Sequence, residues 1–322
     1  MKKLVFYRSI FISWYCAIND CTFCHFSANK HNKREVARRS PASIFAEAFI
    51  EKELGWGHGP MSGGVGSYSI DDLKMICAGV SKILGHKIWL NIGALSKSML
   101  EQLQPYLEGV TGAIETVNEE IHKKTCPSKP VAPYLAMFRN AETLGMKKGM
   151  TIIVGLGETK EDYPKLKAFI EEHKIDKFSC ASFVQMKGTE MENVQPPSAE
   201  YHAWWIGAVK RDFPQVEVVA GIWDERVEYL NQLIEAGCDG FCKYPGLREF
   251  GSPTSKRIEE IALAHGRPLA GTLTKVPNVN WEEIVEKHGF TGAMKEEIIK
   301  KIKRYIQAAT STKESKPGLP VL

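Results

Sequence analysis

Three cysteines near the start of the chain have a spacing that suits metal chemistry. Cys16, Cys21 and Cys24 lie in one short segment, and no second CxxC pair follows them. Three thiolates hold a 4Fe–4S cluster and leave one iron open to another ligand. A structural zinc ion needs a fourth protein ligand, for which His25 and His31 are the nearest residues. The spacing therefore predicts a cluster, with a zinc knuckle as the alternative.

The composition is that of a soluble globular protein in a reducing compartment. The 322 residues are 43% hydrophobic and 25% charged, and the net charge of +4 is too small and dispersed to predict a nucleic-acid surface. Arg8 interrupts the first apolar stretch, and bulky Trp14 and Tyr15 stand where an export signal needs small residues. No apolar stretch is long enough to span a bilayer. We therefore expect a cytoplasmic protein that binds neither nucleic acid nor membrane.

Short apolar segments alternate with amphipathic helical stretches over most of the chain. Helices are expected at 69–84, 133–145 and 159–173, each with a capping residue or proline at its start. The eight expected strands are 7–14, 60–63, 87–92, 110–115, 150–154, 177–183, 216–220 and 240–243. This alternation predicts an α/β fold, a TIM-type (β/α)8 barrel, complete or nearly so, with function at the carboxyl ends of its strands.

The pattern changes beyond residue 275, which gives the expected domain organisation. The barrel domain covers 1–275, a C-terminal helical extension covers 276–309, and a flexible tail covers 310–322. Helices are expected at 281–287 and 294–308, and the second is strongly basic. Charge on a helix usually faces water, so a solvated face is favoured over a partner-binding surface.

The cysteine segment resembles the signature of the radical S-adenosylmethionine (radical SAM) superfamily. It reads Cys-x4-Cys-x2-Cys with the aromatic Phe23 before the third cysteine, whereas the usual spacing is Cys-x3-Cys-x2-Cys. Further motifs in the family's order make roughly residues 5–265 similar to the biotin synthase branch. The resemblance implies that Cys16, Cys21 and Cys24 bind the 4Fe–4S cluster. It also implies that the open iron chelates the methionine end of S-adenosylmethionine.

The same resemblance implies a set of cofactor-binding residues. The turn at 62–64 stands where the family has a GGE-like turn, the segment 114–118 resembles its ribose and sulfonium contact, and 151–159 is similar to its GxIxGxxE motif. The implied residues are Phe23, Ser62, Gly63, Gly64, Glu115, Asn118, Lys129, Tyr134, Ile153, Gly155, Glu158 and Lys187. Tyr134 stands where relatives have an arginine, and Lys129 is the nearest cation, although an ammonium does not replace a bidentate guanidinium.

Biotin synthesis itself is excluded by the residues at its second cluster. Those ligands align with Met61, Trp89, Gly149 and Glu217, none of which replaces them. A different second iron–sulfur cluster is one interpretation of three further cysteines, and free buried thiols are the other. These cysteines are Cys126, Cys238 and Cys242. A second cluster would favour sulfur insertion, as in archaeal two-protein lipoyl synthases.

The resemblance implies a radical SAM enzyme of cofactor biosynthesis. Reductive cleavage of S-adenosylmethionine gives a 5′-deoxyadenosyl radical, which abstracts hydrogen from a small-molecule substrate for rearrangement or addition. Methylornithine synthase, the HydE-type maturase and the enzyme of the iron-hydrogenase pyridinol precursor are the analogies. Ferredoxin or flavodoxin is the expected electron donor. Expected substrate contacts, with ordinary packing as the alternative, are Trp89, Asn91, Gln185, Glu190 and Trp223.

Two readings from other classes remain open on the sequence alone. One is a zinc-stabilised binding protein on a barrel scaffold, in which the three cysteines are structural. The other is an aldolase-like barrel with Lys187 as a Schiff base, which leaves the cysteines unexplained. Metal content separates the first from the enzyme, and borohydride trapping tests the second.

Overall fold

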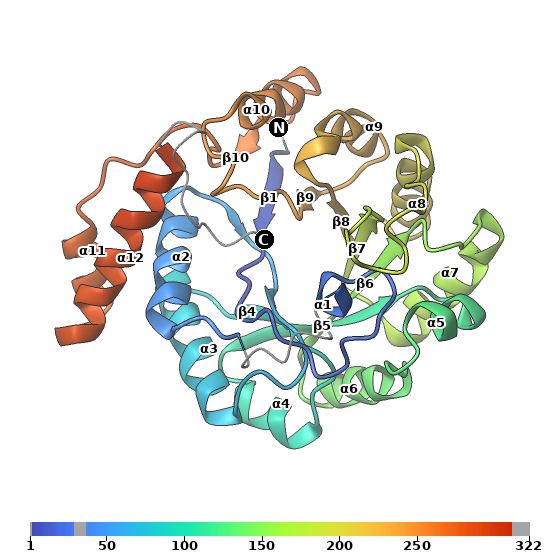
Figure 1. Ribbon diagram of the computed structural model, residues 1–322, viewed down its shortest axis with the longest axis horizontal. Coiled ribbons are helices and arrows are strands. Elements are labelled where there is room, and N and C mark those ends of the chain that lie inside the picture. The colour runs from blue at the N-terminus through green and yellow to red at the C-terminus, as the bar shows by residue number, and fades with distance from the viewer. Residues whose placement is uncertain (1, 29–36, 311–322) are drawn as a thin grey trace.

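The structure is a computed structural model that describes residues 2–28 and 37–310. Figure 1 shows a ring of strands with the helices arranged around its outside. The strands are β1 Leu4–Arg8, β2 Gly57–His58, β3 Met61–Ser62, β4 Ile88–Asn91, β5 Leu107–Glu115, β6 Lys147–Val154, β7 Lys177–Ser182, β8 Glu217–Gly221, β9 Gly240–Cys242 and β10 Leu269–Ala270. The helices are α1 His25–Ala28, α2 Pro41–Glu53, α3 Ile70–Leu84, α4 Lys97–Leu103, α5 Glu119–Thr125, α6 Ala132–Thr143, α7 Tyr163–His173, α8 Ala199–Asp212, α9 Leu230–Glu235, α10 Pro253–Ala264, α11 Trp281–Lys287 and α12 Gly292–Thr310.

Parallel pairing runs from β3 through β9 to β1, and an isolated parallel bridge between Phe11 and Ser62 links the two ends of the sheet, which confirms the predicted barrel-type fold. Strands β3 to β9 pair in sequence order, β9 pairs with β1, and β1 pairs with β2. The expected strand at 60–63 is present as the shorter β3, and Pro60 lies outside it because proline has no N–H for the ladder. Strand β2, just before Pro60, was not predicted. Strand β10, which the sequence did not predict, adds to the start of β1 through Leu4 and Val5.

The first strand differs from its prediction. Strand β1 begins at Leu4 and ends at Arg8, whereas 7–14 was expected. Beyond Arg8 the backbone still follows β3, since Ser62 N donates to Ile10 O at 3.0 Å, but Phe11 makes only an isolated bridge there. Strands β5 and β6 also begin three residues early. The first residues of these strands include charged side chains such as Lys147. These charges interrupt the apolar pattern from which the start of a strand is predicted.

Local capping explains why the helices form where the sequence predicts them. The Ser69 side chain accepts from Asp72 N at 3.2 Å, and Gly85 ends α3 with φ 83°.

At one end of the barrel interior, Lys177 Nζ lies 4.8 Å from the ring centres of both Tyr7 and Trp89. This layer fills the end where the strands begin. The site therefore lies at the opposite end, where the strands finish.

Helix α12 packs against α2 on the outside of the barrel, and α11 packs against α12 (Figure 1). Ile298 and Ile302 of α12 are buried, and the Tyr305 hydroxyl lies 2.7 Å from Ser43 Oγ of α2. The expected helices at 281–287 and 294–308 are thus present as α11 and α12. The domain boundary at 275 stays a prediction, and the proposed tail lies outside the described residues apart from Thr310.

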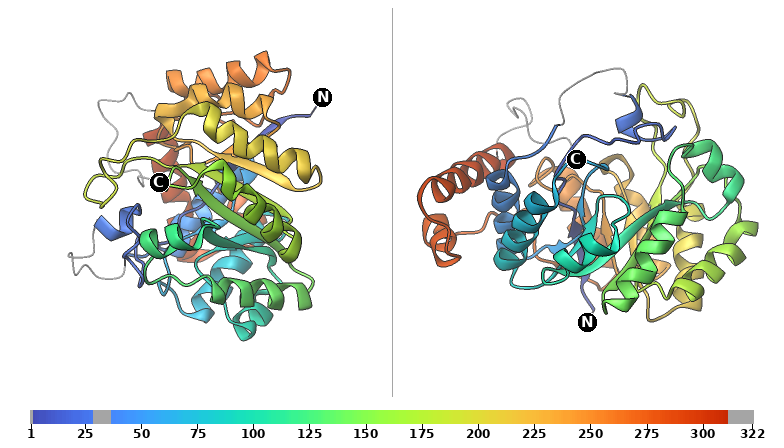
Figure 2. Two further views of the ribbon diagram at one scale, coloured as in Figure 1. Left: turned by 90° about the vertical axis from the view of Figure 1, so that its right-hand side faces the viewer. Right: turned by 90° about the horizontal axis from the view of Figure 1, so that it is seen from below.

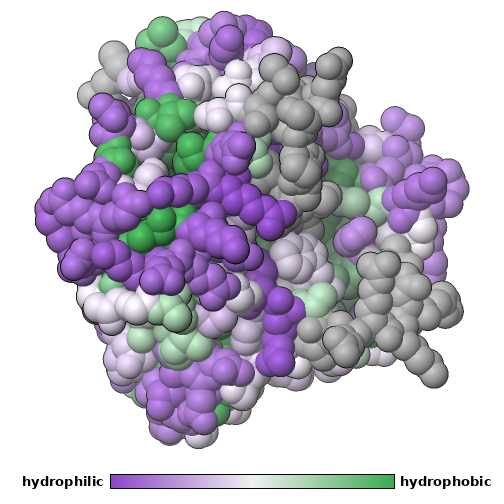
Figure 3. All heavy atoms as spheres, turned by 60° about the vertical axis from the view of Figure 1, so that its left-hand side comes forward, coloured by the Kyte–Doolittle hydropathy of each residue, from purple (hydrophilic) through white to green (hydrophobic). Residues whose placement is uncertain are grey.

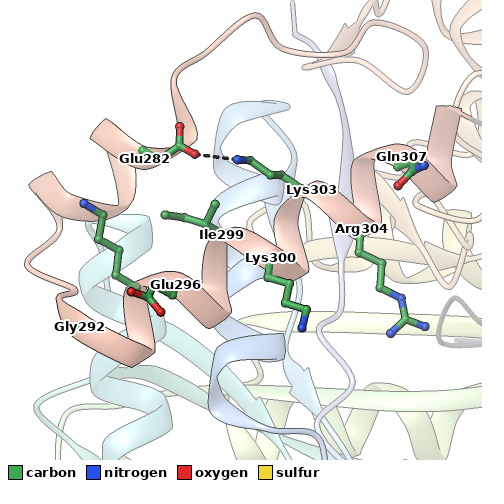
Figure 4. Close-up of a pocket in the computed structure, with 9 residues that line it drawn as sticks. Glu282, Gly292, Glu296, Ile299, Lys300, Lys303, Arg304 and Gln307 are labelled. Atoms are coloured by element: carbon green, nitrogen blue, oxygen red, sulfur yellow. Dashed lines mark hydrogen bonds and ion pairs between the residues drawn. The ribbon is translucent and has the colours of Figure 1, made fainter.

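The outer face of α12 carries the basic residues that the sequence singled out. Figure 3 shows this side of the molecule as largely hydrophilic with small apolar patches. Lys303 pairs with Glu282 at 2.7 Å (Figure 4), and Lys295 pairs with Glu286 at 2.8 Å. Such pairs are typical of a solvated face. None of the described helices is long and apolar enough to cross a membrane.

Candidate active site

The loop that holds the three cysteines follows β1 at the carboxyl end of the barrel. Figure 2 shows α1 and the segment before it at the end of the barrel opposite the N-terminus. Backbone hydrogen bonds fix the loop on two sides: Ala17 N donates to Val65 O at 3.0 Å, and Thr22 N donates to Thr125 O at 2.9 Å. The loop is thus tied to the glycine turn after β3 and to the end of α5.

The glycine turn at 62–64 packs directly on the cysteine loop. A Cβ at Gly64 would lie 2.0 Å from Tyr15 O and 2.5 Å from Cys16 Cβ, so only glycine fits there. A Cβ at Gly63 would meet the side chain of Ile12 at 3.2 Å. The resemblance had assigned these glycines to a close approach of the cofactor. In the structure, Gly64 is required by a close approach of the cysteine loop.

Gly64→Ala is expected to displace the cysteine loop and to cost about 1–3 kcal/mol of stability. The reason is that the new methyl group meets backbone, which cannot move aside without shifting Cys16. We expect the variant to retain far less iron than the wild type after anaerobic reconstitution. Gly63→Ala is the matched control, because the tightest contact of its methyl group is with the flexible Ile12 side chain at 3.2 Å and the Ser13 backbone lies at an ordinary 3.5 Å. Equal iron retention in the two variants would contradict this account.

The three thiols are half-buried and lie close to one another. Burial raises the pKa of Cys24 to about 12, and the Cys21 and Cys16 thiols act in the same direction. The pKa of Cys21 is raised, most strongly by a hydrogen bond with Cys126 and next by burial of the thiol. In the described part of the chain, no three His, Cys, Asp or Glu side chains already surround one point as metal ligands do. Three thiols in one loop are nevertheless the donor set of a 4Fe–4S cluster, so the residues fit that group.

Glu115, Lys129 and Tyr134 form a buried group beside the cysteine loop. Lys129 Nζ lies 2.5 Å from Glu115 Oε1 and 5.5 Å from the centre of the Tyr134 ring. Burial opposes the charge on Lys129, but the Glu115 carboxylate outweighs it and raises the pKa of the lysine. Glu115 has φ 65°, a conformation that a residue with a Cβ seldom adopts. The structure thus brings these three predicted residues together, with Lys129 directed at Glu115.

Lys129→Met is expected to destabilise the protein by about 3–5 kcal/mol, because it leaves the Glu115 carboxylate buried without its partner. The double variant Lys129→Met with Glu115→Gln removes both charges and should recover much of that loss. Urea unfolding followed by circular dichroism measures both values. If the double variant is less stable than the single variant, the buried pair does not account for the effect.

Two other predicted residues have structural partners. The Asn118 amide oxygen caps α5, accepting from Glu120 N at 3.1 Å, and its amide nitrogen donates to Asp162 at 2.9 Å. The Glu158 carboxylate accepts from Gly155 N at 2.7 Å and from Leu156 N at 2.9 Å. Both residues therefore shape the ends of β5 and β6. A role of either residue in cofactor binding would be additional to these structural contacts.

A pocket of about 520 Å³ opens at the carboxyl end of the strands. Four of the predicted site residues line it: Phe23, Cys24, Ser62 and Ile153. Phe23 is buried against Leu156 and Phe183, which follow β6 and β7, so it packs the cysteine loop onto these strand ends. The pocket thus has a thiol on one wall, and its volume is large enough to hold small molecules.

Comparisons with known proteins agree with this geometry. The radical SAM superfamily model matches residues 12–170. An uncharacterized protein of Methanocaldococcus jannaschii is 32% identical over 89% of this chain and 80% of its own length. The chain belongs to the radical SAM superfamily of enzymes. Members of this superfamily use S-adenosylmethionine and a 4Fe–4S cluster.

Other relatives place this radical SAM enzyme among barrel proteins. The 7,8-didemethyl-8-hydroxy-5-deazariboflavin synthase of Archaeoglobus fulgidus is 30% identical over 46% of this chain and 47% of its own length, so the match covers about half of that enzyme. The crystal structure of methylornithine synthase superposes with a TM-score of 0.66 at 18% identity, over 93% of this chain and 86% of that one. The maturase HydG of Carboxydothermus hydrogenoformans has a TM-score of 0.70 at 14% identity, over 96% and 81%. These two likenesses establish the shared fold.

Some expected contacts of the radical SAM site lie elsewhere. Trp89 is buried in the filled end of the barrel beside Lys177, so it is a core residue and not a substrate contact. Lys187 and Glu190 are exposed and do not line the pocket, whereas Gln185 and Trp223 do. Asn91 ends β4, and its carbonyl accepts from Gly63 N at 3.2 Å. His25, at the start of α1, is exposed and lines the pocket, and His31 lies outside the described residues.

The three cysteines proposed for a second cluster do not come together. Cys238 precedes β9 and Cys242 ends it, so about 13 Å of extended chain separates them. Cys126 lies instead beside Cys21, in a small cluster with Phe23, Leu156 and Phe183. The sequence spacing suggested proximity because it did not show that a strand runs between Cys238 and Cys242.

Several pocket residues were missed by the sequence reasoning. Asp224 and Glu225 follow Trp223 after β8, and Lys243 and Arg248 follow β9. Their common signal is position, since each comes just after the carboxyl end of a predicted strand. In a barrel of this kind such positions face the site. That rule singles out position 243, which closes the strand expected at 240–243, but it does not give the direction of the Lys243 side chain.

Proposed function

We propose that Cys16, Cys21 and Cys24 hold a 4Fe–4S cluster at the barrel mouth, and that the chain uses S-adenosylmethionine there to abstract hydrogen from a small molecule. One observation carries this proposal: Cys24 and Phe23 form one wall of the same pocket whose other walls carry the polar residues after β8 and β9. Cofactor and substrate would therefore share one enclosed space. That is the arrangement a short-lived radical requires.

When bound, the cluster supplies the electron that cleaves S-adenosylmethionine to methionine and the 5′-deoxyadenosyl radical. The chain's own residues bind and orient the reactants. Ile153 and Phe23 give an apolar surface suited to the adenine ring. The Glu115 carboxylate lies next to the cysteines, where it can accept hydrogen bonds from ribose hydroxyls. Lys129 acts through Glu115, by holding its charge and position.

The proposed reaction class is rearrangement or addition in the biosynthesis of a cofactor. Its support is the likeness of half the chain to 7,8-didemethyl-8-hydroxy-5-deazariboflavin synthases. Sulfur insertion is disfavoured, because Cys238 and Cys242 lie at opposite ends of β9. The expected partners are a small-molecule substrate and an electron donor such as ferredoxin or flavodoxin. The specific analogy to the pyridinol-forming enzyme stays a prediction from the sequence.

Anaerobic reconstitution tests this proposal. We expect about four irons and four sulfides per chain, with the broad visible absorption of a 4Fe–4S cluster. We also expect S-adenosylmethionine to perturb the spectrum of the reduced protein, because it binds the open iron. Retention of about one zinc ion and no sulfide would favour the zinc-stabilised binding protein instead. About eight irons would restore the second cluster and with it sulfur insertion.

A further inference from the structure

Lys243 has an unusual backbone conformation at the mouth of the barrel. Four residues other than glycine have a positive φ in the described part of the chain, and Lys243 is one of them, with φ 70°. Two others are at the same end of the barrel: Asn19 in the cysteine loop, and Glu115 at the end of β5. Such conformations are disfavoured for residues with a Cβ and gather at functional sites. This observation directs attention to what the Lys243 side chain does.

The conformation turns the Lys243 side chain into the barrel. A Cβ at Gly240 would lie 2.6 Å from the Tyr7 ring, so position 240 faces the interior, and Phe241 packs outward on Phe6. Regular alternation would then point residue 243 outward. Instead, a Cβ at Gly221 of β8 would lie 3.3 Å from Lys243 Cγ. The left-handed residue thus reverses the alternation, and Gly221 leaves room for the lysine stem.

The charge of Lys243 is not used by the rest of the described chain. Its side chain lines the pocket and is exposed there, and within residues 2–28 and 37–310 its Nζ makes no hydrogen bond or ion pair. Two other charged residues of the pocket, Asp224 and Arg248, neutralise each other, and a third, Glu225, has a shifted pKa. Arg248 pairs with Asp224 at 2.7 Å, and burial, assisted by Asp224, raises the pKa of Glu225 so that it ionises less readily. The Lys243 ammonium at this position is therefore available to pair with an anion bound in the pocket.

We propose that Lys243 binds an anionic group, a carboxylate or a phosphate, on the substrate of this enzyme. The rest of the substrate is apolar or aromatic, because aromatic side chains supply much of the pocket wall. These side chains are Phe11, Trp14, Phe26, Phe183 and Trp223. The inference rests on the proposed function, because it names a chemical group on the substrate of the proposed reaction. A lysine presents a point charge, which suits either anion without requiring a planar fork.

Binding of matched probes to the reconstituted full-length protein tests this inference. The anionic probes are 3-phenylpropionate and phenyl phosphate, and 3-phenylpropionamide is the neutral analogue of the first. Isothermal titration should show wild-type protein binding the better anion at least about tenfold more tightly than the amide. Comparison of the two anions distinguishes a carboxylate site from a phosphate site. Equal affinity for all three probes would overturn the inference.

Variants at position 243 assign the preference to this residue. Lys243→Gln should bind anion and amide equally, while Lys243→Arg should keep the anion preference. Lys256→Gln, which removes an exposed lysine on α10, is the control and should behave as wild type. Circular dichroism and iron content establish that each variant is folded and loaded. An anion preference that survives in Lys243→Gln would overturn the assignment.

The two levels of the proposal fail separately. If the protein binds anions through Lys243 but holds no iron–sulfur cluster, the anion site stands and the proposed radical chemistry falls. If the protein cleaves S-adenosylmethionine but shows no anion preference, the radical chemistry stands and the role of Lys243 falls.

Discussion

Cys24→Ala is expected to abolish both retention of the 4Fe–4S cluster and formation of 5′-deoxyadenosine. The thiol lines the pocket, and a cluster with two remaining protein ligands should not survive desalting. Cys16→Ala and Cys21→Ala should behave alike, because the three thiols act as one ligand set. Iron and sulfide analysis after anaerobic reconstitution measures the first effect. Chromatography of the products after reduction measures the second.

Two other cysteine variants make this result specific. Cys77 is a fully buried thiol in α3, far along the chain from the loop, and Cys77→Ala should keep about four irons. Cys242→Ala should also keep about four irons, because in the described part of the chain Cys242 belongs to no group of three potential metal ligands. Loss of about half of the iron in Cys242→Ala would contradict the single-cluster account. Full iron in Cys24→Ala would contradict the assignment of the loop.

Glu47→Gln is expected to cost about 3–5 kcal/mol of stability or to prevent folding. The Glu47 carboxylate is completely buried in α2 between two guanidinium groups, at 2.6 Å from Arg8 and 2.5 Å from Arg39. Its loss leaves two buried cations facing each other. The same group supports the site, because Arg39 Nη1 also donates to Phe11 O at 2.9 Å in the segment that leads to the cysteine loop. Chemical denaturation of wild type and variant measures the difference.

The pH dependence of stability gives this prediction a test that needs no folded variant. Burial opposes the charge on Glu47, but Arg8 and Arg39 outweigh it and hold its pKa below the ordinary value. A carboxyl group of this kind stabilises the fold above its unfolded pKa, and that contribution is lost as the pH falls through the folded pKa. Stability of the wild type should therefore fall steeply on acidification. Glu51 acts in the opposite direction, because burial raises its pKa.

A surface carboxylate provides the control for Glu47. Glu101 is about half exposed and lies 4.0 Å from Lys97 on α4, so Glu101→Gln should change stability by less than about 0.5 kcal/mol. A loss in Glu101→Gln as large as that in Glu47→Gln would show that burial of the charge is not the cause.

The parts of the fold that could be predicted are those with local signals. Ser69 and Gly85 mark the ends of α3 through capping chemistry, and the helix from residue 281 to residue 287 was found at its expected position. The errors in the predicted strands occur where residues far apart in the sequence determine the pairing. Strand β2 was not predicted and is defined by its pairing with Tyr7 and Arg8 of β1. Strand β10 is likewise defined by the pairing of Leu269 with Leu4 of β1.

The candidate site divides in the same way. The three cysteines and Phe23 are adjacent in sequence, so their spacing alone predicts their common role. The pairing of Lys129 with Glu115 joins two elements, and no local pattern predicts it. Lys243 was missed because its inward direction depends on a left-handed backbone at the end of β9 and on a glycine in the neighbouring strand.

The most direct test of the central claim is the yield of 5′-deoxyadenosine. Reconstituted protein is reduced anaerobically with dithionite in the presence of S-adenosylmethionine, and the products are quantified by mass spectrometry. We predict 5′-deoxyadenosine and methionine in equal amounts from the wild type, and neither product from Cys24→Ala. A protein that carries a full 4Fe–4S cluster and binds S-adenosylmethionine, yet forms no 5′-deoxyadenosine under these conditions, would contradict the account.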